Sequence, residues 1–463
     1  LDLADALAGD TVLFPDLGHN VAFRNAVEDP IDFSGYEVVV TEDVANSRVA
    51  AVSIEPRVVA ASIVDGRLTC WASSQGAHSF RQAVAEILGL EPEDMRVYVK
   101  DIGGGFGAKG VPSEEEVMVV YLARLLERPV RWTETRTENL TGYVHGRAQD
   151  QKVTIAGTRD GDIQAYRLEL IQDSGAYPKY GAFLPEFTRQ MASGVYDIGR
   201  VELEFASVVT TTAPICAYRG AGRPEATAAI ERAVDLFAAE IGMDPAEVRR
   251  RNLPSPDAFP FTNGTGTVYD SGEYERALDV ALEAADYAGL RAEQQRRRDA
   301  GDVRQLGIGV CTYVEITGFG GSEYGEVRLQ PDGTVLAVTG STPIGTGHLT
   351  TWAMIVADRM GVPIEAITVF HGDTDRVPSG QLTGGSRSVQ IAGSSMGDAA
   401  DKLIELAREA AADLLEAAPG DIVLDRERGA FHVAGSPTAA RSWAEIAGDA
   451  GEPLVGLSDF AQA

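Results

Sequence analysis

Glycine-rich segments placed directly after expected strands constrain this chain more than any other feature. Four of them follow short strand-like runs, and all but residues 103–107 carry a polar side chain. Glycine lets successive backbone N–H groups turn towards one bound anion, because it adopts backbone conformations that other residues avoid. The segments are residues 75–78, 103–107, 219–224, 340–348 and 383–388. One such loop is usually a plain turn, but several together predict backbone anion cradles around one large ligand.

Strands and helices alternate along the chain without a regular βαβ period, which favours mixed sheets over a Rossmann array. The Asp65-Gly66 turn predicts a hairpin. Apolar spacing predicts a helix over His348–Met360 and one charged helix over Tyr274–Asp299, while Gly307–Glu315 is expected to be a strand. We therefore expect an α+β fold built from two similar mixed α/β layers. The predicted organisation is a first domain over residues 1–255, a linker and helix over 256–305, and a second domain over 306–463.

The charge of the chain is strongly negative. Its 463 residues include 40 Lys+Arg and 69 Asp+Glu, a formal charge of −29, and arginine supplies nearly all the positive charge. High net charge resists association while salt screens self-repulsion, so this composition predicts an acidic, halophile-like surface. An ordinary acidic cytosolic protein is the alternative. In either case, nucleic acid and anionic membrane surfaces are poor partners.

Cysteine usage points to a reducing compartment. Cys70, Cys216 and Cys311 are widely spaced and form no CxxC pair, iron–sulfur ligand set or zinc quartet. No apolar run approaches the roughly 18 residues of a spanning helix. We therefore expect a cytoplasmic protein that does not associate with membranes.

The familiar short motifs do not account for the glycine-rich loops. Residues 103–108 loosely fit a dinucleotide fingerprint, but no acidic residue ends a following strand at the required distance. The run Gly107-Ala108-Lys109-Gly110 lacks the Gly before Lys and the Ser/Thr after it that a phosphate-binding P-loop needs. No histidines show metal-ligand spacing, although His348 opens a helix beneath a glycine loop. The residues alone thus predict no protein metal ligands and leave the ligand unnamed.

Five motifs follow one another along the chain, and together they resemble a known family. They are Ser73-Ser74-Gln75-Gly76-Ala77-His78, residues 102–109 (IGGGFGAK), residues 217–225 (AYRGAGRPE), residues 340–348 (GSTPIGTGH) and Thr383-Gly384-Gly385-Ser386-Arg387-Ser388. In this order they resemble the molybdopterin-binding large subunit of the xanthine oxidase/aldehyde oxidase family, closest to its carbon-monoxide-dehydrogenase-like branch. The resemblance extends over essentially the whole chain.

The resemblance implies a molybdenum–molybdopterin cofactor, as a cytosine dinucleotide, whose metal contacts no protein side chain. By matching motifs, Gln75 would hydrogen-bond a molybdenum oxygen, and Phe106 and Gly107 would offer backbone amides. Arg219 would contact the cofactor from the third loop. These residue types suit the task, since amide and guanidinium groups donate to oxo groups. The full set of implied cofactor-binding residues is Gln75, Gly105, Phe106, Gly107, Arg219, Thr346, Gly347, His348, Gly385, Ser386 and Ser388.

The resemblance also implies an activity and partners. The activity is oxidative hydroxylation of an aldehyde or N-heterocycle with water as the oxygen source. Electrons would leave through [2Fe–2S] centres to FAD, and this chain lacks cysteines for such clusters. We therefore expect an iron–sulfur small subunit and an FAD-binding medium subunit as partners. Two other functions stay open: a non-catalytic cofactor-binding half that needs another chain for its base, and a flavin or nicotinamide oxidoreductase.

Several positions depart from the family pattern. No segment after Gly435 resembles the family's catalytic glutamate motif and its N-terminal portion is not matched, so we assign no catalytic residue and expect a piece lacking both ends. Thr346 stands where the loop commonly has Gln. Gly220 stands where carbon monoxide enzymes carry a copper-binding cysteine. Gly110 and Ala221 stand where purine-oxidising members grip the substrate, so we expect an aldehyde in preference to carbon monoxide or xanthine.

Overall fold

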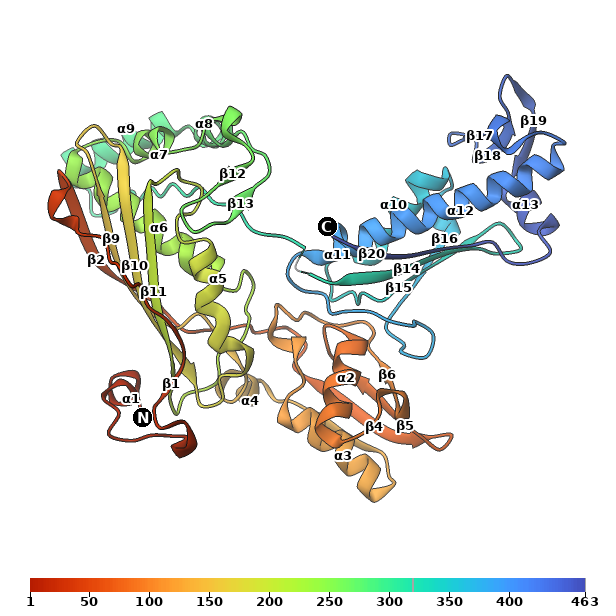
Figure 1. Cartoon of the computed structure of the whole chain (residues 1–463), viewed down its shortest axis with the longest axis horizontal. Coiled ribbons are helices and arrows are strands. Elements are labelled where there is room, and N and C mark those ends of the chain that lie inside the picture. Colours follow the sequence, from red (N-terminus) through yellow and green to blue (C-terminus); the bar gives the residue numbers. More distant parts are fainter. Residues whose placement is uncertain (319, 463) are drawn as a thin grey trace. The chain divides into compact units, whose positions relative to one another are not determined.

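The computed structural model describes residues 1–318 and 320–462, which form two compact units. Unit 1 comprises Leu1–Ala51 and Gly142–Glu315, and unit 2 comprises Val52–Thr141 and Ile316–Ala463. Each unit therefore joins segments that are far apart in the sequence (Figure 1).

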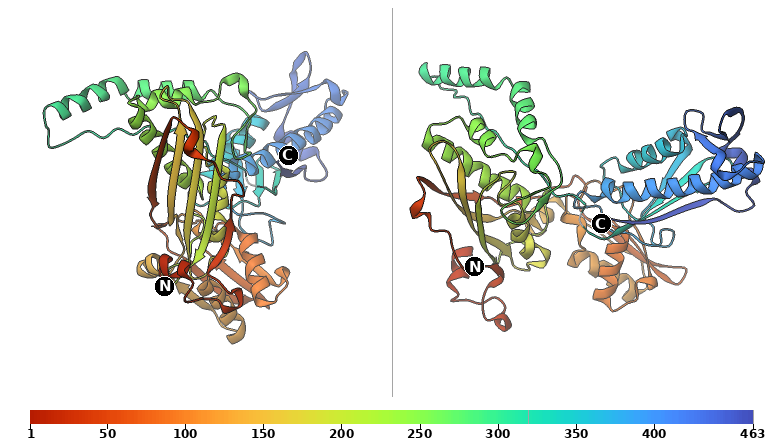
Figure 2. Two further views of the ribbon diagram at one scale, coloured as in Figure 1. Left: turned by 60° about the vertical axis from the view of Figure 1, so that its left-hand side comes forward. Right: turned by 45° about the horizontal axis from the view of Figure 1, so that its top comes forward.

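Unit 1 is built on a five-stranded mixed sheet. Its strands, in sheet order, are β1 (Val21–Asn25), β11 (Arg200–Val209), β10 (Ile163–Gly175), β9 (Gln149–Gly157) and β2 (Val38–Asn46). The pair β10/β11 is parallel and the other pairs are antiparallel. Helix α6 (Arg223–Ile241) lies along the sheet (Figure 2). Its Ile230, Val234 and Phe237 share a buried core with Tyr166 and Leu168.

Short elements complete unit 1. They are α1 (Leu3–Ala8), β3 (Val49–Ala50), β8 (His145–Gly146), α5 (Leu184–Gln190), α7 (Pro245–Arg251), β12 (Phe261–Thr262), β13 (Val268–Tyr269), α8 (Tyr274–Ala284) and α9 (Tyr287–Asp299). The expected single helix over Tyr274–Asp299 is wrong, because Asp286 adopts a left-handed φ of 49° and caps Gly289 at the start of α9. The expected strand over Gly307–Glu315 is also wrong. This segment is extended but forms no ladder within the described chain.

Unit 2 contains two four-stranded sheets, each covered by two helices. The first has β6 (Met95–Tyr98), β5 (Arg67–Ala72), β4 (Val58–Val64) and β7 (Val130–Thr133), with α2 (Ala77–Leu88) and α3 (Glu114–Leu126) packed on it. The second has β16 (Ile367–Phe370), β15 (Val335–Thr339), β14 (Ser322–Leu329) and β20 (Val455–Ala461), with α10 (His348–Met360) and α12 (Ala392–Leu414) packed on it. The remaining elements are α4 (Arg136–Thr141), α11 (Arg387–Gln390), β17 (Ile422–Asp425), β18 (Ala430–Val433), β19 (Ser436–Ser442) and α13 (Trp443–Asp449).

The mixed α/β layers expected from the sequence are confirmed. The Asp65-Gly66 turn joins β4 to β5, and α10 has the bounds that the apolar spacing predicts. In each sheet of unit 2, the chain leaves a strand end and enters a glycine-rich loop: β5 precedes residues 75–78 and β15 precedes residues 340–348. Strand ends thus position the loops that carry the candidate site.

Candidate functional site

The Gln75 side chain joins three of the five glycine-rich loops. Its Oε1 accepts hydrogen bonds from the backbone N–H groups of Gly107 (2.9 Å) and Lys109 (3.1 Å). Its Nε2 donates to the carbonyl of Thr383 at 2.7 Å. The backbone of Gln75 repeats this pairing, because its N–H donates to the Lys109 carbonyl and its carbonyl accepts from the Thr383 N–H. The structure therefore brings loops 75–78, 103–107 and 383–388 together around one buried amide.

Loop 103–107 presents unpaired backbone donors. A Cβ on Gly105 would lie 2.6 Å from Gln75 Cγ, so only glycine allows the two loops to pack this closely. Phe106 adopts a left-handed φ of 56° and is 38% exposed. The N–H groups of Gly105 and Phe106 donate to no described residue, whereas that of Gly107 is taken by Gln75. Gly105 and Phe106 thus offer free backbone donors on this loop.

Loop 383–388 divides into an exposed tip and a buried base. Gly385 and Ser386 at the tip are exposed, and Ser386 has a left-handed φ of 54°. Ser388 is buried, and its hydroxyl donates to Thr383 Oγ1 at 3.1 Å. Beside this base, the buried hydroxyl of Thr342 has no hydrogen-bond partner among the described residues.

The loop that opens α10 also belongs to unit 2. Ile344 packs against the core that contains Ile102, directly before loop 103–107. Thr346 and Gly347 are exposed, and Thr346 Oγ1 lies 3.0 Å from Nε2 of His348. Partial burial lowers the pKa of His348, so its ring is neutral near pH 7. This loop therefore offers a hydroxyl and a neutral imidazole.

Arg219 lies in unit 1, on loop 219–224. Its side chain is exposed and makes no hydrogen bond or ion pair within the described part of the chain. The loop itself is fixed, since the Gly222 N–H donates to Glu225 Oε2 at 2.9 Å at the start of α6. An exposed guanidinium on a fixed loop is available to an anion.

Two ion pairs beneath the loops, one partly buried and one fully buried, were not predicted from the sequence. Lys109 Nζ lies 2.8 Å from Glu55 Oε2, which also accepts from the Gly103 N–H at 2.8 Å. Arg387 Nη1 lies 2.9 Å from Glu323 Oε2 under loop 383–388. Burial raises the pKa of Glu323 to about 7, with Arg387 opposing the rise. The only sequence signal was that Lys109 and Arg387 lie inside the recognised motifs.

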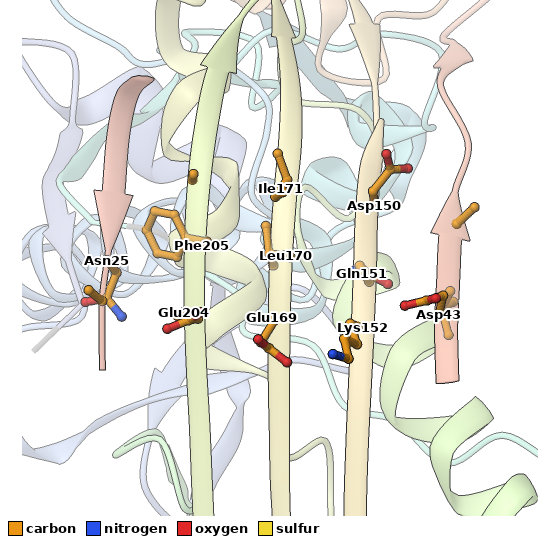
Figure 3. A pocket seen from close by; sticks show the side chains of 14 residues that line it. Asn25, Asp43, Asp150, Gln151, Lys152, Glu169, Leu170, Ile171, Glu204 and Phe205 are labelled. Carbon is orange, nitrogen blue, oxygen red and sulfur yellow. The ribbon is translucent and has the colours of Figure 1, made fainter. Parts of the chain in front are cut away.

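A separate hollow of unit 1 lies away from the loops. Figure 3 shows it on the five-stranded sheet, with a volume of about 630 Å³ and the charged side chains of Asp43, Asp150, Lys152, Glu169 and Glu204 along its wall. Glu169 alternates with the core residue Leu168, so it points to the opposite face of the sheet. None of the residues expected to bind the cofactor lines this hollow.

The donors at the loops fit an oxygen-rich anionic group. In unit 2, the free backbone amides at Gly105 and Phe106 and the unpartnered Thr342 hydroxyl are donors to such a ligand. In unit 1, the exposed Arg219 guanidinium is a donor of the same kind. In residues 1–318 and 320–462, no group of three or more His, Cys, Asp or Glu side chains is arranged to hold a metal ion. Over the same residues, no helix has the length and apolar character needed to cross a bilayer. The site thus defines a class of protein that binds an anionic cofactor through loops.

Comparison with known proteins identifies that class. Two family models match the chain, each described as a molybdopterin cofactor-binding domain, over residues 13–253 and 280–461. The chain belongs to this molybdopterin-binding family, as a large subunit of the xanthine oxidase type. The resemblance stated from the five motifs is therefore confirmed.

Similar proteins are molybdenum-dependent oxidoreductases. The carbon monoxide dehydrogenase large chain of Hydrogenophaga pseudoflava is 36% identical, over 98% of this chain and 60% of its own length. The nicotine 6-hydroxylase large subunit of Paenarthrobacter nicotinovorans is 32% identical, over 96% and 57%. Among solved structures, quinoline 2-oxidoreductase from Pseudomonas putida 86 matches with a TM-score of 0.92 at 32% identity, covering 99% of this chain and 62% of that one. The chain thus spans less than two thirds of the length of these relatives.

Proposed function

We propose that this chain is the cofactor-binding part of a molybdenum hydroxylase large subunit. The reaction is oxidative hydroxylation of an aldehyde or an N-heterocycle, with water as the oxygen source. The observation that carries the proposal is the junction at Gln75, where three loops with family motifs meet around one buried amide. The cofactor is proposed to be molybdenum–molybdopterin in its cytosine dinucleotide form.

The residues of this chain would hold the cofactor by donating hydrogen bonds. The second Nε2 hydrogen of Gln75 and the free N–H groups of Gly105 and Phe106 are donors to oxo groups. Gly107 contributes by orienting Gln75, because its own N–H is already donated to that side chain. Arg219 supplies a charge-assisted donor. When bound, the cofactor supplies two-electron redox chemistry at an electrophilic carbon.

The two loops around the second sheet would hold the organic part of the cofactor. Gly385 and Ser386 expose a backbone turn. Thr346, Gly347 and His348 lie at the start of α10, where the Thr346 hydroxyl is hydrogen-bonded to the His348 ring. Ser388 would contribute indirectly, because its hydroxyl donates to Thr383 and so stabilises the base of loop 383–388. These roles extend the cofactor site from the 103–107 loop to the start of α10.

The same proposal includes the wider assembly. An iron–sulfur small subunit and an FAD-binding medium subunit would accept the electrons, and a cytoplasmic location would keep the three free cysteines reduced. As evolutionary domains we propose residues 1–255 and 306–463, joined by 256–305.

The substrate is proposed to be an aldehyde or an N-heterocycle, with an aldehyde preferred over carbon monoxide or xanthine. Gly220 has a φ of 98°, and a Cβ there would lie 2.3 Å from Cγ of Pro224. A cysteine is therefore disfavoured at the position where the family's carbon monoxide enzymes bind copper. Gly110 and Ala221 are small, so neither side chain can make a polar or aromatic contact with a purine.

The decisive experiment is cofactor analysis of the chain purified with its partner subunits from a host that makes molybdenum cofactors. We expect molybdenum and cytidine monophosphate in equal amounts, and oxidation of an aldehyde panel by the complex. Arg219→Ala should lower the molybdenum content strongly, because a charged donor to an anion is lost. Arg159→Ala, which removes an exposed arginine from the same unit, is the control. Bound FAD or nicotinamide without molybdenum, or carbon monoxide oxidation, would overturn the proposal.

A further inference from the structure

Arg147 makes an unusual set of contacts with the loop that carries Arg219. We propose that Arg147 is a positioning residue that fixes the backbone of residues 218–222 and so holds Arg219 ready for an anionic ligand. This inference rests on the proposed function for the identity of that ligand. The contacts themselves lie wholly within unit 1.

The guanidinium of Arg147 binds two consecutive carbonyl groups of the loop. Its Nη1 donates to the Tyr218 carbonyl at 3.0 Å, and its Nη2 donates to the Arg219 carbonyl at 2.7 Å. The same group lies 4.9 Å from the centre of the Tyr218 ring. A planar fork of donors can serve two carbonyls and stack on a ring at once, which a lysine ammonium cannot. The loop is therefore clamped on the residue that bears the exposed cation.

A buried carboxylate completes the clamp from the other end of the loop. Arg147 Nη1 lies 3.3 Å from Glu225 Oε1, and Glu225 Oε2 accepts from the Gly222 N–H at 2.9 Å. Glu225 is fully buried, and the Arg147 side chain is 12% exposed. Burial raises the pKa of Glu225, and the positive charge of Arg147 opposes that rise. The pair thus links the carbonyls of residues 218 and 219 to the amide of residue 222.

The backbone around Arg147 is strained in a way that serves this contact. Arg147 and Ala148 are consecutive non-glycine residues with left-handed φ values of 67° and 62°. Such conformations cost free energy and persist where surrounding structure enforces them. The residues before Arg147 are held by neighbouring structure. Gly146 packs so closely on Tyr218 that a Cβ on it would lie 2.4 Å from Tyr218 Cβ, and the Cys216 N–H donates to the His145 carbonyl at 2.8 Å. The strained backbone of residues 147–148 therefore lies where this segment contacts the loop that carries Arg219.

Unit 1 offers a matched control at Arg167. This arginine also binds a buried carboxylate, Glu202, at 2.9 Å, donates to a backbone carbonyl, Ile31, at 2.8 Å, and lies 5.1 Å from the Phe33 ring centre. Its contacts are equivalent in kind to those of Arg147, but none involves the Arg219 loop. Replacing each arginine by lysine therefore removes similar interactions at two places, of which only one is proposed to matter for the cofactor.

The test compares Arg147→Lys with Arg167→Lys in the full chain, isolated with its partners from the cofactor-producing host. We expect Arg147→Lys to retain about ten-fold less molybdenum per chain. This is the effect expected when one charge-assisted hydrogen bond to the ligand is lost. Hydrogen exchange of the amides in residues 217–222 should also be faster. Arg167→Lys should keep the molybdenum of the wild type at a comparable melting temperature. Equal molybdenum in the two variants would overturn the proposal.

A double variant separates positioning from general stability. If Arg147 acts through Arg219, then Arg147→Lys adds no further loss of molybdenum to Arg219→Ala, whereas independent effects would add. Additive losses would contradict the proposal. Should Arg147→Lys not fold, Glu225→Gln provides the same comparison, because it weakens the ion pair but keeps an acceptor for the Gly222 N–H. A wild-type chain without molybdenum would refute the proposed function instead, while hydrogen exchange would still test the clamp.

Discussion

Replacing Gln75 by methionine tests whether one side chain holds three glycine-rich loops together. Gln75 is 1% exposed, and its amide group makes three hydrogen bonds to backbone groups of two other loops. Methionine is similar in length, so the variant creates little empty space. It leaves two N–H groups and one carbonyl without partners. Each buried group left unpaired costs about 1–3 kcal/mol, so the loss of three such pairings should lower the free energy of unfolding by about 3–9 kcal/mol.

Tryptophan fluorescence measures this loss of stability in unit 2, which contains Gln75. The four tryptophans, Trp71, Trp132, Trp352 and Trp443, all belong to unit 2. Urea unfolding followed by their emission therefore reports the stability of the unit that contains Gln75. A shift of the midpoint with an unchanged slope gives the change in free energy directly.

The control is Gln294→Met in unit 1. Gln294 is 6% exposed and donates to the Leu306 carbonyl at 2.9 Å, so it is also a buried, hydrogen-bonded glutamine. Its replacement should leave the tryptophan transition in place. A loss below about 1 kcal/mol in Gln75→Met, or one no larger than in the control, would show that the loops hold together without this amide.

Three further predictions concern single contacts. Gly220→Cys should lower the melting temperature and bind no copper by metal analysis, because its Cβ would meet Pro224 and its φ of 98° is unfavourable; a stable, copper-binding variant would contradict this. Arg387→Met should destabilise unit 2 by about 3 kcal/mol in the tryptophan assay, because it leaves the buried Glu323 carboxylate unpaired; a neutral effect would mean that the pair contributes nothing. Burial and the nearby Lys100 lower the pKa of His371 to about 4, from 6.5. The unfolded chain therefore binds the proton first, and stability should fall between pH 6.5 and 4 by up to about 3 kcal/mol more than in His371→Asn; parallel pH profiles would refute the assignment.

Local sequence signals predicted the elements that are stabilised locally. The Asp65-Gly66 turn has its residues between two antiparallel strands, and Gly361 ends α10 in a left-handed conformation just past the expected helix. The break between α8 and α9 was missed although Asp286 and Gly289 form a local cap. Helix α9 is mostly charged and polar, so apolar periodicity could not show where one helix ends and the next begins.

The segment Gly307–Glu315 shows what a local pattern cannot decide. Its alternating residues suit a strand, but a strand needs a partner ladder, and these residues instead line a hollow together with α8 and α9. The hydroxyl of Thr312 lies 2.7 Å from that of Tyr196, more than a hundred residues earlier in the chain. A contact of such sequence separation leaves no trace in a single sequence.

The candidate site was also predicted only in part, because contacts between residues distant in the sequence cannot be predicted from local patterns. The loops themselves were found because glycine clusters are local, and four of the five meet in unit 2. The groups that fix them were not found: Glu323 is 64 residues from Arg387, and Arg147 is 72 residues from the Arg219 carbonyl that it binds. Charged side chains that act through distant backbone groups show no spacing of their own.

Glycine occurs in residues 103–110 for two different physical reasons, and the structure distinguishes them. At Gly105 a Cβ would lie 2.6 Å from Gln75 Cγ, so glycine is required by packing between loops whatever ligand is bound. At Gly110 a Cβ would meet nothing nearer than Leu382 Cδ2 at 3.9 Å. A side chain at position 110 can therefore change the surroundings of the loop without moving it. Differences in substrate between relatives are accordingly expected at position 110, because a change at position 105 would first separate the loops that Gln75 joins.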